Sequence, residues 1–291
     1  MHAYDDPVHA PLGLRAARRY GRVAPAAAHA QHMPSHIFFA LGMWDDAVEA
    51  NIASLATARS QGQGGYHALE WLSYAYLQQG KRDDAAKLLK IVEDDVAQKP
   101  TQANRSSLAY DRAMWLAKTG GAAGADGWTS VDESGITSIY SFSAHDFAWC
   151  VVAARPVILR LPKPISSGCA RADAARKHVT GVAASRYDTV MPEEIRQGGI
   201  LATALEGTIL FAQGERATGL ARVREAITTA DTMAFEYGPP FSAKPLDELL
   251  GDLLLTAGKP VEAVAAYEKT LAAHPNRRLS VEGLAAARAA Q

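Results

Sequence analysis

The chain has 291 residues, of which 48% are hydrophobic, so it can bury a substantial core. Its 30 basic and 31 acidic residues nearly balance, and the absence of a basic block argues against a nucleic-acid-binding surface. No apolar run reaches the roughly 18 residues that a membrane span requires. The two cysteines, Cys150 and Cys169, have neither a disulfide framework nor the spacing of a zinc ribbon. We interpret them as buried thiols.

The N-terminal segment, residues 1–7, is polar and lacks the apolar core of a signal peptide. Residues 10–23 have the pattern of the second helix of a helical hairpin, so we expect the natural chain to extend further upstream. The apolar side chains of this helix, Leu12, Leu14 and Val23, would then lose their cover, and we expect self-association at the N-terminal end. The sequence fits a soluble protein of the cytoplasm or the periplasm and does not distinguish the two.

Four segments of the chain align on a period near 34 residues, which is the period of tetratricopeptide repeats. In each segment small residues recur where two antiparallel helices would approach closely, as at Gly251 and Ala263 in the last one. The period predicts an all-α fold, a right-handed α-α superhelix of the tetratricopeptide-like solenoid type, forming one domain. The predicted repeats span residues 28–61, 66–100, 200–233 and 244–277.

Two stretches interrupt this pattern. Residues 120–138 are rich in Gly, Ala, Asp and Ser and are predicted to form a loop. Prolines interrupt the helix expected over residues 156–168, so this stretch is predicted to be irregular. Residues 281–290 have the pattern of a capping helix at the end of the array.

Histidines and a carboxylate gather on the first helices of the first two repeats. His32 and His36 are four residues apart, and His67 and Glu70 are three apart, so each pair shares one helix face. Adjacent helices pack about 8–10 Å apart, which lets side chains from both reach one ion. We therefore predict His32, His36, His67 and Glu70 as metal ligands.

Imidazole and carboxylate ligands suit a divalent transition metal, namely zinc, iron, copper or manganese. Two other interpretations remain open at this stage: a hydrogen-bonded polar pocket without metal, and histidines that are merely solvated. Pro34 bears on the choice because proline is best tolerated at the first position of a helix. If a helix begins there, His29 and His32 lie ahead of it and only His36 is helical.

Further residues are predicted to face the same concave groove and to contact a ligand. His29 and Tyr74 occupy first-helix positions of the repeats, and His145 begins a later helix. Glu236 and Lys244 flank a stiff loop that contains Pro239 and Pro240. The predicted ligand-binding residues are His2, His29, Tyr74, His145, Glu236, Lys244 and Glu248.

Three motifs are more specific than the generic repeat: HMPSHI at 32–37, YHALEWL at 66–72 and FEYGPP at 235–240. Through them the chain resembles a largely uncharacterised bacterial family of tetratricopeptide-repeat proteins, over most of its length. Members of that family carry a second histidine where this chain has Glu70, a residue that can also ligate a metal. The resemblance implies an upstream extension and a helical-repeat fold, and it brings no established activity.

The groove supports two hypotheses of function. In the first, the protein binds a metal ion or a small polar ligand there, and a bound ion could activate water for hydrolysis. In the second, the protein is a non-catalytic scaffold that binds a peptide or partner protein. The histidines and glutamates of the groove favour the first hypothesis. No nucleophile triad or phosphate loop is present in the sequence, so catalytic residues are not predicted.

Overall fold

The computed structural model describes residues 2–120, 148, 192–233 and 238–291. Every regular element within these ranges is a helix, so the prediction of an all-α protein is confirmed. The predicted irregular segment 156–168 lies outside the described residues, and so does 120–138 except for Gly120, which ends a helix with a positive φ of 71°. Among the described helices, none combines the length and the hydrophobicity that crossing a bilayer requires.

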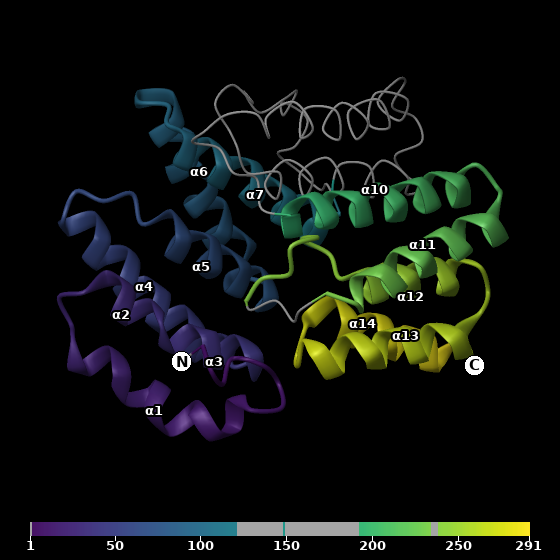
Figure 1. Cartoon of the computed structure of the whole chain (residues 1–291), viewed down its shortest axis with the longest axis horizontal. Coiled ribbons are helices and arrows are strands. Elements are labelled where there is room, and N and C mark those ends of the chain that lie inside the picture. The colour runs from purple at the N-terminus through teal and green to yellow at the C-terminus, as the bar shows by residue number, and fades with distance from the viewer. Residues whose placement is uncertain (1, 121–147, 149–191, 234–237) are drawn as a thin grey trace.

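Helices α1–α7 form one group, coloured purple to blue in Figure 1. Helices α2 and α3 follow one another as a single interrupted helix, which packs beside α1 and α4, and the later members lie side by side as hairpins. The polypeptide enters α5 through Gly65 in the left-handed region. Their bounds are α1 (Ala10–Val23), α2 (Ala28–His32), α3 (Pro34–Ala40), α4 (Trp44–Ser60), α5 (Tyr66–Gln78), α6 (Arg82–Gln98) and α7 (Gln102–Thr119).

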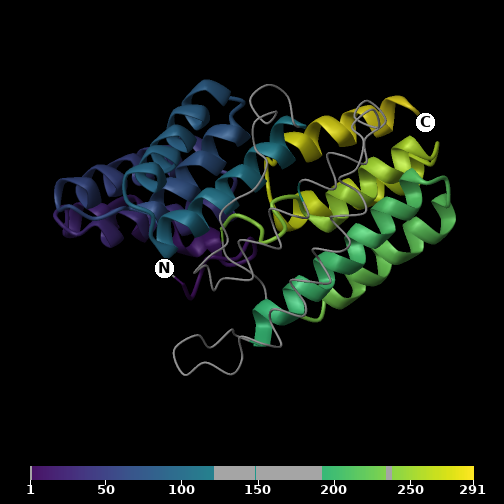
Figure 2. The same cartoon turned by 90° about the horizontal axis from the view of Figure 1, so that it is seen from above.

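Helices α10–α14 form a second group, green to yellow, beside the first (Figures 1 and 2). Glycines let these helices pack closely: a Cβ on Gly207 would lie 2.7 Å from the carbonyl oxygen of Gly219, and one on Gly251 would lie 2.8 Å from the Tyr267 ring. The bounds are α10 (Pro192–Ala212), α11 (Arg216–Ala230), α12 (Leu246–Thr256), α13 (Pro260–Ala273) and α14 (Arg278–Ala289).

The junction between α2 and α3 decides how the histidines are presented. Pro34 has no N–H, so the regular helix ends at His32 and begins again at Pro34. Met33 between them keeps right-handed helical dihedrals, with φ −51° and ψ −36°. The chain therefore turns continuously through the break, and His32 and His36 stay on one face. His29 and His32 lie in α2 and His36 lies in α3, so all three histidines are helical although a helix begins at Pro34.

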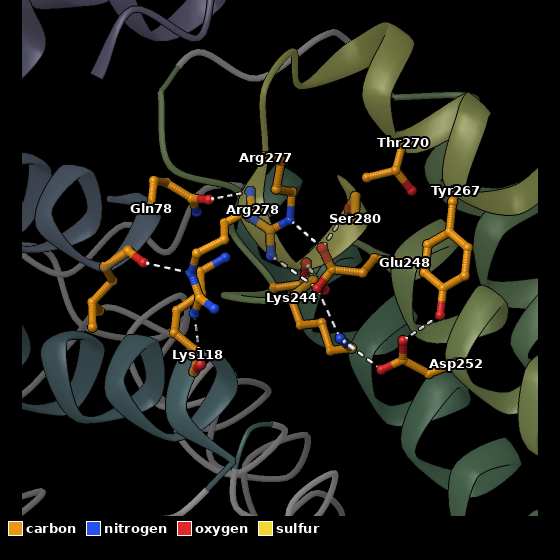
Figure 3. A network of polar contacts seen from close by, with 12 residues as sticks. Gln78, Lys118, Lys244, Glu248, Asp252, Tyr267, Thr270, Arg277, Arg278 and Ser280 are labelled. Atoms are coloured by element: carbon orange, nitrogen blue, oxygen red, sulfur yellow. Dashed lines mark hydrogen bonds and ion pairs between the residues drawn. The ribbon is translucent and has the colours of Figure 1, made fainter. Parts of the chain in front are cut away.

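A buried network of charges joins the two helix groups (Figure 3). Arg277, which is fully buried, donates to Glu248 of α12 at 2.5 Å and to the Tyr74 hydroxyl of α5 at 2.5 Å. Lys244 donates to the other oxygen of Glu248 at 2.7 Å and lies 2.9 Å from Asp252. Burial alone would raise the pKa of Glu248, but the cations Arg277 and Lys244 hold it well below its usual range. Glu248 is therefore charged at neutral pH.

Neutral contacts extend this junction. The Trp44 indole donates to the carbonyl of Asn276 at 2.9 Å, and the Tyr110 hydroxyl donates to the carbonyl of Pro240 at 3.1 Å. Gly238, with a φ of 82°, packs so closely on Trp71 that a Cβ there would lie 2.2 Å from the indole. The loop ahead of α12 thus packs against α5 at Trp71, the residue that also contacts His32 and His36 of the predicted metal site.

Helix α1 leaves apolar side chains exposed, as the sequence predicts for Leu12 and Val23, which are 73% and 79% exposed. Leu14 differs from that prediction, because it packs against the core of the first helix group. Self-association through this face stays a prediction.

Replacing Arg277 with methionine should destabilise the protein strongly, because Glu248 would lose its main counter-charge while remaining buried. Removing one partner of a buried ion pair costs about 3–5 kcal/mol. The free energy of unfolding from urea titration measures this loss. Arg288→Met is a matched control, since the Arg288–Glu268 pair on the same helix group is exposed and should contribute little. Equal losses in the two variants would contradict the role assigned to the network.

Candidate metal centre

His32 is buried between α2 and α4, and its neighbours determine its tautomer. Its Nδ1 lies 2.7 Å from Oδ1 of Asn51. The Asn51 amide nitrogen donates to the Ala47 carbonyl at 2.8 Å, which fixes the orientation of the amide and leaves Oδ1, an acceptor, facing the ring. Nδ1 of His32 must therefore carry the hydrogen, and Nε2 is left with its lone pair.

His36 is oriented in the same way by a carboxylate. Its Nδ1 lies 2.9 Å from Oδ2 of Asp5, whose side chain is completely buried. A histidine that gives its Nδ1 hydrogen to a carboxylate presents Nε2 as a ligand, an arrangement common around metal ions. Asp5 comes from the N-terminal segment ahead of α1, so the site joins that segment to α3.

The two Nε2 atoms face each other at 3.2 Å. With metal–nitrogen bonds of about 2.0–2.1 Å and angles of about 90–110°, two ligands of one ion lie about 2.9–3.4 Å apart. Burial, and then the other histidines, lower the pKa of His32 to about 3 and that of His36 to about 2. Both rings are therefore neutral at pH 7, as ligation requires.

His67, at the start of α5, supplies the third nitrogen. One ligand nitrogen from each of His32, His36 and His67 lies within 4.8 Å of the other two, and His67 is the exposed member. Desolvation lowers the pKa of His67 as well. The Trp71 ring packs under the group, with centroid distances of 4.7 Å to His32 and 4.5 Å to His36. The group is thus covered by the Trp71 ring on one side and reaches solvent at His67.

Glu70, the fourth predicted metal ligand, is not part of this group. It lies on α5 toward α7, where it hydrogen-bonds to Ser107 and interacts with the buried carboxyl of Asp111. Burial raises the pKa of Glu70 to about 7, and burial together with the charge of Glu70 raises the pKa of Asp111 well above its usual range. The two carboxyl groups therefore hold at least one proton near neutral pH.

The remaining predicted ligand-binding residues fall into three sets. His2 lies at the site, with Nδ1 3.1 Å from Asp5 Oδ2, and the exposed His29 stacks on His32 at 6.1 Å. The residues of the second set bond to partners in the buried network that joins the helix groups, so a ligand would have to displace one of those partners. They are Tyr74, Lys244 and Glu248. The third set lies outside the described residues: His145 and Glu236.

Sequence reasoning missed Asn51, Asp5 and Trp71. Asn51 lies in the middle of α4, where an asparagine is unfavourable unless its side chain has a specific partner. Its position in the sequence could therefore have indicated a buried hydrogen bond. Asp5 was visible only as part of a polar N-terminal cluster. Trp71 looks like an ordinary core residue, and nothing in its spacing marks it as the floor of the site.

The chain matches no family model, no curated protein and no solved structure. Its function must therefore be inferred from the geometry of the described residues.

The carboxyl pair predicts a pH dependence of stability. Since folding raises the pKa of Glu70 and Asp111, the stabilising protonated form is present at low pH and is lost as pH rises through about 7. Wild type should lose thermal stability as the pH rises from acidic values through about 7, the pKa of Glu70, and Asp111→Asn, which cannot ionise at that position, should lose less. Melting temperatures across this range measure the difference. An unchanged slope in Asp111→Asn would show that the carboxyl groups are not coupled.

Proposed function

We propose that the protein binds a divalent transition-metal ion through His32, His36 and His67. The observation that carries this proposal is the buried contact between the two Nε2 atoms at 3.2 Å. Both rings give their Nδ1 hydrogen to another acceptor, so two lone pairs point at each other. A cation between them removes that repulsion, and the separation is the one that a shared ion imposes.

The contact can also be satisfied by a proton in place of an ion. Asp5 would be protonated and donate to Nδ1 of His36, and Nε2 of His36 would then donate to His32. Burial raises the pKa of Asp5, which makes this protonation less costly than for an exposed acid. Metal binding and this proton shift exclude each other at His36, since the lone pair of Nε2 serves only one of them.

Imidazole ligands suit zinc, copper, iron or nickel. Three protein nitrogens leave a tetrahedral ion one further position, which is the pattern of sites that bind water or substrate rather than of closed structural sites. A water molecule bound to such an ion has a pKa near 7 and serves as a nucleophile. The exposed position of His67 supports entry from that side. Hydrolysis is therefore the reaction class that we propose to test once an ion is bound.

Zinc should stabilise protein that has been stripped with a chelator. An ion at 100 times its dissociation constant stabilises the folded state by about 2.7 kcal/mol. His32→Ala and His67→Ala should lower zinc affinity by at least tenfold and reduce the rise in melting temperature. Isothermal titration calorimetry and differential scanning fluorimetry measure the two effects.

His9→Ala is the matched control, because His9 is exposed, its ring hydrogen-bonds to the neighbouring Asp6, and it belongs to neither group of candidate ligands. It should bind zinc as wild type does. If wild type takes up no zinc, copper, iron or nickel, the metal proposal fails, and the rival hypothesis of a partner-binding scaffold becomes the leading one.

A further inference from the structure

A second group of ligand atoms lies on the far side of His36. His2, Asp5 and His36 each offer one atom, and these atoms lie within 4.8 Å of one another. Oδ2 of Asp5 is 2.9 Å from Nδ1 of His36 and 3.1 Å from Nδ1 of His2. These separations are again those of neighbouring ligands around one ion, about 2.9–3.4 Å apart.

The second carboxylate oxygen of Asp5, Oδ1, indicates that a bound cation belongs at this position. Oδ1 is buried and accepts no hydrogen bond from the described residues. An unsatisfied buried acceptor costs about 1–3 kcal/mol, and more when it belongs to a charged group. The imidazoles of His2 and His36 both approach Oδ2, so neither of them donates a hydrogen bond to Oδ1. A cation bound by the carboxylate would satisfy both oxygens.

The donor set fits a transition metal. Two imidazoles and one carboxylate from three residues form a combination typical of zinc and of non-haem iron sites with open positions. His2 is the exposed member, with 58% of its side chain accessible, whereas Asp5 is buried. An ion can therefore enter at His2 and be held at Asp5.

We propose that this group binds a second divalent ion, so that the His36 ring bridges two ions through its two nitrogens. The proposal rests on the proposed function, because the first ion occupies Nε2 of His36. When the second ion binds, it replaces the hydrogen on Nδ1 of His36. That proton is released to solvent, and Asp5 changes from a hydrogen-bond acceptor to a ligand. The ring becomes an imidazolate, and no bond other than this N–H is broken.

Zinc titration of chelator-stripped protein tests the stoichiometry. Wild type and His9→Ala should bind two ions per chain, as measured by calorimetry and by elemental analysis after gel filtration. Asp5→Asn and His2→Ala should each bind one ion. Asp5→Asn keeps the shape and the acceptor oxygen at His36, and His2 is exposed, so neither change should prevent folding. Circular dichroism checks that it does not.

Copper provides a readout that a purely structural role of Asp5 would not affect. Two Cu²⁺ ions bridged by an imidazolate couple magnetically, so the electron paramagnetic resonance signal at two equivalents should fall below the signal at one equivalent. In Asp5→Asn the first equivalent should give the signal of an isolated ion, and the second should add no coupling.

The outcomes separate the two proposals. One ion in wild type and one in Asp5→Asn would overturn the second site and leave the first standing. Two ions in both proteins would place the second ion elsewhere and also overturn this inference. No bound ion in wild type would overturn both proposals.

Discussion

The ion pair between Arg277 and Glu248 is the constraint on which the rest of the structure depends. Both side chains are fully buried, and Arg277 comes from the segment between α13 and α14 while Tyr74, its other partner, comes from α5. A buried charge that loses its partner is costly, so Arg277 is held in place by Glu248 within the second helix group. From that position it donates to Tyr74 of α5, and this bond ties the second helix group to the first. In that arrangement Gly238 packs directly on the Trp71 ring. Since Trp71 also contacts His32 and His36, the network supports the floor of the candidate metal centre from a distance.

Helical periodicity predicted the parts of the site that are local in the chain. The four-residue spacing of His32 and His36 places both on one face, and it holds because Met33 stays helical across the Pro34 break. The all-α fold was predictable for the same reason, since the repeat is read from spacing. Asn51 and Asp5 were not predictable in this way. They reach the histidines from 19 and 31 residues away, and no period relates them to the ligands.

Glu70, Tyr74, Lys244 and Glu248 show the limit of assigning residues to a groove from repeat positions. A position that faces the concave side faces solvent only if no other element fills that side. Here the segment from Pro240 to Arg278 lies against α5 and α7, as its hydrogen bonds to Tyr74, Gln78 and Tyr110 show. Glu70 is covered differently, by Ser107 and Asp111 of α7. Polar residues that the repeat pattern assigns to a ligand therefore satisfy one another.

The same histidines that form the candidate centre also weaken the fold in acid, and this links the site to stability. His32 and His36 have pKa values of about 3 and 2 in the folded protein and would have values near 6.5 unfolded. Below pH 6.5 the unfolded chain binds more protons, so stability falls as pH falls toward 3. Hydrophobic side chains at these positions would avoid that loss. The chain instead buries two neutral imidazoles whose Nε2 atoms lie 3.2 Å apart, and the cation that we propose to bind there would turn this arrangement from a cost into a source of stability.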